Sequence, residues 1–177
     1  MKRLITVSGT WSGLRRVVGV PARIRDARWK LGLVQAAMEG AQGALADGFA
    51  TETDPYGRRW QPSRRAELEG GQTLSDTGRL RRSFRWRAQP DGFWLGTDVV
   101  YAAAHQYGAV IRPKHGRYLM VPVLGRGRRG RARPMEWRRV REVVVPVRQM
   151  VPEGDLGPRW AGAIQRSANA YIRRTLR

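Results

Sequence analysis

Two histidines and one Asp-Thr-Gly motif are the residues of this chain that could carry chemistry. His105 and His115 are separated by a Gly and Pro break, and their spacing does not match that of zinc ligands on a helix or a hairpin. A nucleophilic triad needs a histidine or cysteine beside a serine, and the chain has no cysteine. The acidic residues are scattered, without the close pair used by glycosidases and two-metal nucleases. We therefore expect no catalytic residue, no cofactor and no metal, and interpret His105 as a packed or hydrogen-bonded scaffold residue.

The Asp-Thr-Gly motif lies in the stretch LSDTGRLRRSFRW, residues 74–86. Aspartic proteases share these three residues, but they need a second such aspartate, which this chain lacks in a matching context. We interpret Asp76 as the cap of a short helix from which Leu80 faces the core, with arginines pointing outward. We interpret Asp54 similarly, as part of an Asp-Pro-Tyr-Gly turn that Trp60 packs against the body of the fold.

The charge of the chain is strongly positive. Lys and Arg total 34 against 14 Asp and Glu, for a formal net charge of +20, and nearly all of the basic residues are arginine. Such a chain is attracted to polyanions or to acidic protein surfaces. The densest run comprises Arg126, Arg128, Arg129, Arg131 and Arg133.

This arginine run has three interpretations. It is a solvated loop, a contact with the phosphate backbone of DNA, or a docking surface for an acidic partner. It has no interleaved aromatic residues for base stacking, and its glycines are not followed by the Lys-Ser/Thr of a nucleotide-binding loop. Since closely spaced arginines repel one another, we expect residues 125–134 to extend from the body and to become ordered against a neighbouring subunit or partner protein.

The hydrophobic pattern predicts an α+β fold in a single domain, residues 1–177. We expect a largely antiparallel sheet packed by a long N-terminal helix and a C-terminal helix, with a projecting basic loop or hairpin. The expected strands are 3–7, 84–88, 93–97, 118–124 and 142–147, and the expected helices are 11–18, 22–49, 77–83, 101–108 and 158–176. Strands 118–124 and 142–147 are expected to pair, and the last helix to lie on the sheet. Residues 51–73 are predicted to form an extended loop, and residues 125–139 an arginine-rich loop.

Two further features limit the interpretation. Four glycines weaken the long helix by about 1 kcal/mol each relative to alanine, which indicates packing or the close approach of another backbone. The N-terminus has no apolar run of signal-peptide length, and no stretch approaches a membrane span. We therefore expect a protein made and used without export, with no membrane partner.

Three ordered stretches of the chain resemble the phage virion morphogenesis family of the Mu type, also called tail completion or head-tail joining proteins. The first carries a phenylalanine, the Asp-Pro-x-Gly turn and a tryptophan. The second carries Leu-x-Asp-Thr-Gly-x-Leu, and the third carries Gly-Thr followed by Tyr-Ala, His-Gln and a glycine. The matching residues are Phe49, Asp54, Pro55, Gly57, Trp60, Leu74, Asp76, Thr77, Gly78, Leu80, Gly96, Thr97, Tyr101, Ala102, His105, Gln106 and Gly108. The long arginine loop and the segment VPVRQMVP, residues 145–152, depart from the family pattern.

The resemblance implies a structural virion protein rather than an enzyme. It implies a ring of identical subunits, a hexamer, at the neck of a tailed phage or phage-like particle, assembled in the host cytoplasm. The implied partners are the connector or head-closure protein and the tail tube protein, with possible contact to packaged DNA. The alternative is a non-specific nucleic-acid-binding protein, which the charge favours and the lack of a reading motif disfavours. A hydrolase is a third interpretation, supported only by the scattered Asp and His residues.

Overall fold

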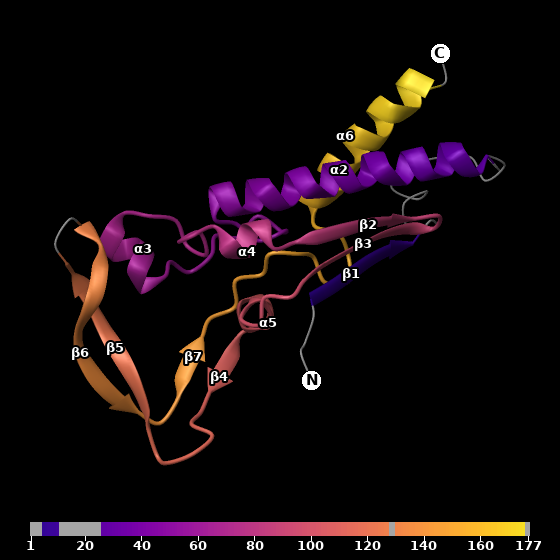
Figure 1. Ribbon diagram of the computed structural model, residues 1–177. Coiled ribbons are helices and arrows are strands. Elements are labelled where there is room, and N and C mark those ends of the chain that lie inside the picture. Colours follow the sequence, from indigo (N-terminus) through magenta and orange to yellow (C-terminus); the bar gives the residue numbers. More distant parts are fainter. Residues whose placement is uncertain (1–4, 11–25, 128–129, 176–177) are drawn as a thin grey trace.

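A helix, a second helix and a three-stranded sheet are stacked in this order in the computed structural model, which describes residues 5–10, 26–127 and 130–175 (Figure 1). The sheet consists of β1 (Ile5–Thr10), β3 (Gly92–Thr97) and β2 (Arg85–Gln89), all antiparallel, in the order β1-β3-β2. The long helix α2 (Ala27–Thr51) packs on the sheet, and the C-terminal helix α6 (Pro158–Thr175) crosses α2. The α+β prediction is confirmed. The helix expected at 11–18 lies outside the described residues.

Helix α2 begins at a side-chain cap and is packed on more than one side. The Asp26 carboxylate accepts hydrogen bonds from the backbone N–H groups of Arg28, at 2.7 Å, and Trp29, at 3.1 Å. A Cβ atom added at Gly40 would lie 2.6 Å from the Ala163 carbonyl oxygen and 2.8 Å from Ile164 Cα. This glycine therefore allows the α6 backbone to approach closely, as the glycine content of the helix predicted.

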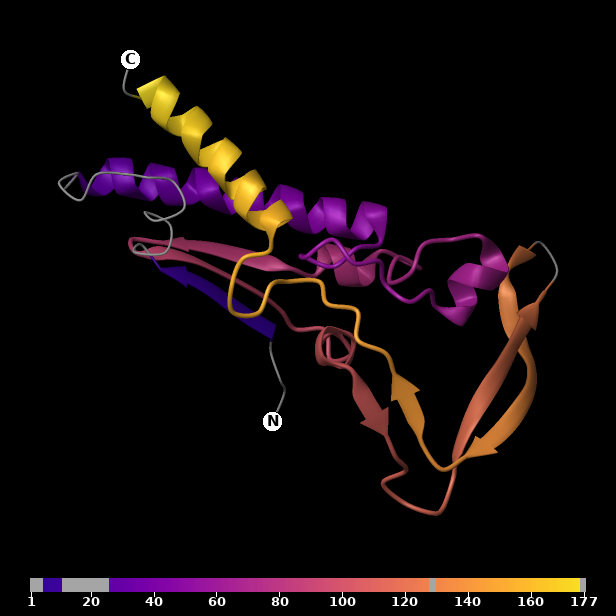
Figure 2. The same cartoon turned by 180° about the vertical axis from the view of Figure 1, so that it is seen from behind.

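Helix α6 packs chiefly on α2 and not directly on the sheet, so the predicted placement of this helix was wrong. Trp160, Ile164 and Ala168 are buried at the predicted four-residue spacing. The reason for the difference is that α2 contributes apolar or small side chains to two sides and occupies the layer between α6 and the strands. Figure 2 shows the same order from the opposite side. The Arg159 side chain fixes the start of α6 by hydrogen bonds to Asp47, in the last turns of α2, and to Thr53, just after that helix.

Strands β2 and β3 form the predicted hairpin, and β2 alternates between a core face and an exposed face. Trp86 and Ala88 pack against the core, whereas Arg85 and Arg87 are exposed. The Trp86 ring lies 6.1 Å from the ring of Phe93 on β3. This alternation fixes the register because a shift by one residue would move the arginines into the core.

Residues 51–73 were predicted to form an extended loop. They instead contain helix α3 (Arg64–Glu69). The Ser63 hydroxyl caps this helix by accepting a hydrogen bond from Ala66 N at 3.2 Å, and Ala66 is buried. The short helix α4 (Arg79–Arg82) and helix α5 (Ala102–Tyr107) follow.

Two paired ribbons form a projecting arm, residues 109–145. Strand β4 (Ala109–Ile111) pairs with β7 (Val143–Val145), and β5 (Leu119–Arg126) pairs with β6 (Ala132–Val140), all antiparallel. Figures 1 and 2 show β4 and β7 leading away from the sheet, and the β5-β6 hairpin turning back toward α3.

The arm corrects two predictions about this part of the chain. Strand 118–124 does not pair with 142–147, and most of the predicted arginine-rich loop, 125–139, is strand β6. The short connection between β5 and β6 contains Gly130, whose φ of +74° suits a tight turn, so the nearer segment becomes the partner. The projecting element is therefore a hairpin.

Candidate functional site

Residues of the first and third motif stretches converge on one irregular segment, residues 146–157, which connects β7 to α6 and is here named the connecting segment. It receives side chains from the Asp-Pro-Tyr-Gly turn, from Trp60 and from α5. Because the segment has little regular secondary structure, these side chains satisfy many of its backbone groups.

Asp54 organises the turn that precedes Trp60. Its Oδ1 accepts hydrogen bonds from Tyr56 N at 2.9 Å and Arg58 N at 2.8 Å, and its Oδ2 pairs with Arg58 Nε at 2.8 Å. The carboxylate is buried although the arginine is exposed. Gly57 has φ of +92°, which explains the glycine at this turn position. The predicted role of Asp54 as a turn residue is confirmed.

The turn holds the end of the connecting segment. The Tyr56 hydroxyl contacts the carbonyl oxygens of Glu153, at 3.0 Å, and Asp155, at 3.2 Å. A Cβ atom added at Gly157 would lie 2.1 Å from the Pro55 carbonyl oxygen, so only glycine fits this approach. The turn thus sets where α6 begins.

Trp60 holds the middle of the connecting segment. It is buried, its ring lies 5.5 Å from the ring of Phe49 in an edge-on arrangement, and its Nε1 donates to the Gln149 carbonyl oxygen at 2.9 Å. The predicted packing of Trp60 against the body of the fold is confirmed.

Gln106 of α5 acts on the connecting segment as a strand would. Its Oε1 accepts from Met150 N at 2.9 Å and from Val151 N at 3.2 Å, while its Nε2 donates to the Val151 carbonyl oxygen at 2.8 Å. The side chain is buried, so each unpaired group would cost about 1–3 kcal/mol. Gln106 therefore supplies hydrogen bonds to backbone groups that are not paired within a strand or helix.

Arg148 is a buried cation that the sequence analysis did not single out. Its Nε donates to the Gln61 carbonyl oxygen at 2.7 Å, and its Nη1 lies 3.4 Å from His105 Nδ1. Burial lowers the pKa of Arg148, and burial followed by the charge of Arg148 lowers the pKa of His105. A single arginine among apolar residues in VPVRQMV is the sequence signal that could have identified it.

Thr97 and Gly108 mark the two ends of the third motif stretch. Thr97 is buried; its hydroxyl accepts from Val99 N at 3.2 Å and contacts the hydroxyl of Ser83, which joins β3 to the end of α4. Gly108 has φ of +72°, and a Cβ atom there would lie 3.0 Å from Val147 Cγ2. Gly96 is buried in β3, Ala102 is buried in α5, and Tyr101 is exposed with its ring 6.1 Å from that of His105.

Asp76 does not cap α4, so that prediction was wrong. The N-cap position is taken by Gly78, in the left-handed conformation, without a side-chain hydrogen bond. The nearby bond is instead from Arg79 N to the Thr77 hydroxyl at 3.3 Å, while Asp76 is exposed and lies 3.9 Å from Arg65. The reason is that α4 begins at Arg79 and not at Thr77 as predicted, so that its N-cap residue is a glycine, which has no side chain to accept a hydrogen bond.

The remaining predictions for this stretch hold. Leu80 is buried, Leu74 packs partly on the core, and the three arginines of α4 are exposed.

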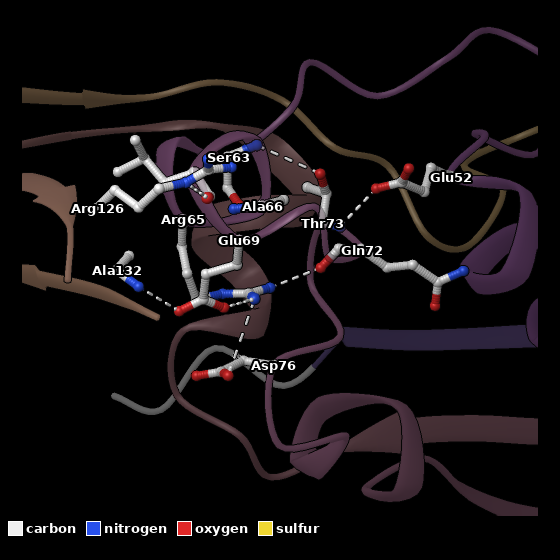
Figure 3. A network of polar contacts seen from close by, with 11 residues as sticks. Glu52, Ser63, Arg65, Ala66, Glu69, Gln72, Thr73, Asp76, Arg126 and Ala132 are labelled. Atoms are coloured by element: carbon white, nitrogen blue, oxygen red, sulfur yellow. Dashed lines mark hydrogen bonds and ion pairs between the residues drawn. The ribbon is translucent and has the colours of Figure 1, made fainter. Parts of the chain in front are cut away.

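The arginine run was predicted to extend from the body and to become ordered against a neighbouring subunit or partner protein. The hairpin tip that carries it turns back and contacts α3 of the same chain at Arg126 and Ala132. Arg126 Nε donates to the Leu68 carbonyl oxygen at 3.3 Å, and Ala132 N donates to Glu69 Oε1 at 2.8 Å (Figure 3). Arg65 pairs with Glu69 at 2.8 Å; this bond and that from Ala132 N lower the pKa of Glu69. Arg131 and Arg133 are exposed, whereas Arg128 and Arg129 lie outside the described residues.

Residues 5–10, 26–127 and 130–175 contain no group of three or more His, Asp or Glu placed to hold a metal ion. Within the same ranges, no helix is long and apolar enough to cross a membrane. The geometry is that of an α+β protein with a projecting basic arm and a hydrogen-bonded junction, by which we mean the connecting segment together with the Asp54 turn, Trp60 and α5.

The family model of the phage virion morphogenesis family matches residues 39–165, and the chain belongs to this family. The match runs from the second half of α2 to the first half of α6, and therefore includes both the junction and the arm. It assigns the protein a role in bacteriophage virion structure or morphogenesis. No curated protein and no solved structure matches the chain.

Proposed function

We propose that this protein forms a ring at the neck of a tailed phage or phage-like particle, where it completes the tail and joins it to the head connector. The observation that carries the proposal is the family match over residues 39–165. The expected ring is a hexamer, and its neighbours are the connector or head-closure protein and the tail tube protein.

The junction suits a protein that transmits position rather than one that performs catalysis. Trp60, Gln106 and Arg148 fix the connecting segment to the turn and to α5 through bonds to backbone atoms. The arm begins and ends at this junction, since β4 follows α5 and β7 precedes the connecting segment. The head-to-tail interfaces of a closed ring need two different surfaces on each subunit, held in a fixed relation to one another, and a well-anchored body can supply them. We accordingly propose that the protein is not an enzyme.

The net charge of +20 affects how such a ring forms. Identical subunits of this charge repel one another at close range, and salt screens the repulsion only in part. The purified chain is therefore expected to remain largely monomeric, and to form the ring when neighbouring components supply negative charge.

The test is a particle lacking this protein, complemented by the wild-type chain. Without the protein, filled heads and separate tails should accumulate, and complementation should restore joined particles that electron microscopy can count. Electron microscopy of labelled particles should place the protein at the head-tail boundary. Joined particles in its absence, or labelling elsewhere, would contradict the proposal.

The charge also supports a second candidate, a non-specific nucleic-acid-binding protein. In that case binding to duplex DNA should fall steeply with salt, with a slope set by the number of phosphate contacts. Tight, salt-dependent DNA binding together with normal head-tail joining in the absence of the protein would favour this candidate.

A further inference from the structure

The arm packs little against the rest of the described chain and exposes many large apolar side chains. Trp137, Met120 and Val144 are 59%, 54% and 66% exposed. The other exposed large apolar residues of the arm are Val110, Ile111, Tyr118 and Met135. Among the described residues, the hydrophobic core contains none from the arm.

Both faces of the β5-β6 hairpin carry apolar residues. Cross-strand partners lie on the same face, so Pro122 and Trp137 share one face with Met120, while Val121 and Val123 lie on the other. A two-stranded ribbon has marginal stability in water when neither face is packed. The few contacts of the hairpin tip with α3 leave most of this ribbon open.

The charge of the arm indicates what covers it. Residues 109–145 contain eleven Lys or Arg residues and two Glu residues, Glu136 and Glu142. Both glutamates are already within ion-pair distance of arginines of the arm, Arg138 and Arg112. The covering surface must therefore be acidic as well as partly apolar.

A second copy of this chain does not have that composition. The chain outside the arm also carries more basic than acidic residues, so two copies would bring like charges together. Duplex DNA would satisfy the arginines but would leave the exposed Trp, Met and Val side chains without a partner. Trp, Met, Tyr and Arg on one surface are instead the composition of a protein interface.

We propose that the arm, residues 109–145, is the docking surface for an acidic protein of a different kind in the assembled particle. This inference rests on the proposed function, because it assumes that the chain is part of the particle. Trp137 is the expected centre of the interface, with Met120 beside it and Arg139 and Arg141 at its edge.

Photocrosslinking in assembled particles tests the inference. Benzoylphenylalanine replaces Trp137 in one full-length variant and Val100, an exposed residue outside the arm, in the control. Illumination should join position 137, and not position 100, to a different virion protein whose sequence, identified by mass spectrometry, is acidic. A product with a second copy of this chain, a product with DNA, or no product above the control would overturn the inference. Absence of the chain from particles would overturn the proposed function and this inference with it.

Matched charge variants provide an independent test with the crosslinked protein as the probe. Arg139→Gln with Arg141→Gln removes two exposed charges from the arm, and Arg85→Gln with Arg87→Gln removes two from β2. The arm variant should bind the identified protein about tenfold more weakly than the β2 variant at low salt, with the difference shrinking as salt rises. Equal affinities of the two variants would contradict the docking of the arm on an acidic surface.

Discussion

Arg148 Nη1 lies 3.4 Å from His105 Nδ1, and Arg148 N also donates to the His105 carbonyl oxygen at 2.7 Å. A guanidinium has no acceptor, so Nδ1 must accept and the His105 proton is on Nε2. Burial and the charge of Arg148 lower the pKa of His105, which favours this neutral form of the ring. This pair joins α5 to the connecting segment and makes the junction sensitive to pH.

Stability should fall as the pH drops below the ordinary histidine range. Burial and Arg148 lower the pKa of His105 below 6.5, so the unfolded chain binds the proton first on acidification. The contribution of the neutral ring is complete above the unfolded pKa and is lost as the pH falls through the folded one. Urea unfolding at pH 8 and pH 5.5 should show a smaller loss for His105→Asn than for the wild type. Equal losses would show that His105 does not titrate as described.

Asp54 and Asp76 should differ in their importance for stability. Asp54→Ala leaves two backbone N–H groups without their acceptor and should lower the free energy of unfolding by about 2–3 kcal/mol. Asp76→Ala removes only a long, exposed ion pair and should change it by less than about 0.5 kcal/mol. Denaturant unfolding of both variants measures the difference, and a similar loss for Asp76→Ala would restore the cap interpretation.

Two glycines of α2 should respond oppositely to alanine. Gly40→Ala places a Cβ against the backbone of α6 and should destabilise the protein by roughly 1–3 kcal/mol. Gly43→Ala meets nothing within 4 Å and should stabilise it by about 0.5–1 kcal/mol through helix propensity. Thermal unfolding of the two variants is the measurement. A stabilising Gly40→Ala would mean that α6 does not approach α2 closely.

The tip of the arm should detach from α3 when Glu69 is removed. Glu69→Ala deletes the acceptor of Ala132 N, and hydrogen exchange at Ala132 should accelerate while exchange in α2 stays unchanged. Glu67→Ala is the control. Glu67 also lies on α3, but its side chain pairs with Arg64, and the hydrogen bonds between α3 and the arm are made by Leu68 and Glu69.

Acid should have the same effect on the wild-type arm. The pKa of Glu69 is lowered by the bond from Arg65, then by that from Ala132. The contact is therefore present above the ordinary glutamate pKa and is lost as the pH falls through the folded value. Protection of Ala132 that persists in Glu69→Ala would argue against this anchor.

Much of the fold was predictable from the sequence because its signals are local. The apolar residues of α6 recur every four positions, and the residues of the Asp54 turn lie within four positions of one another. The β2-β3 hairpin is set by a short turn and alternating residues. The ordered motifs also identified the family, since they depend on residue type and order alone.

Other features depended on tertiary structure because they join residues distant in sequence. Trp60 and Gln149 are 89 positions apart, and nothing local specifies that they meet. The position of α6 on α2 followed from competition among apolar surfaces that all have suitable patterns. The burial of Arg148 and the contact of the arm tip with α3 were missed for a related reason. A charged side chain is expected to be exposed when only the sequence is considered, because its hydrogen-bond partners come from distant segments that the fold brings together.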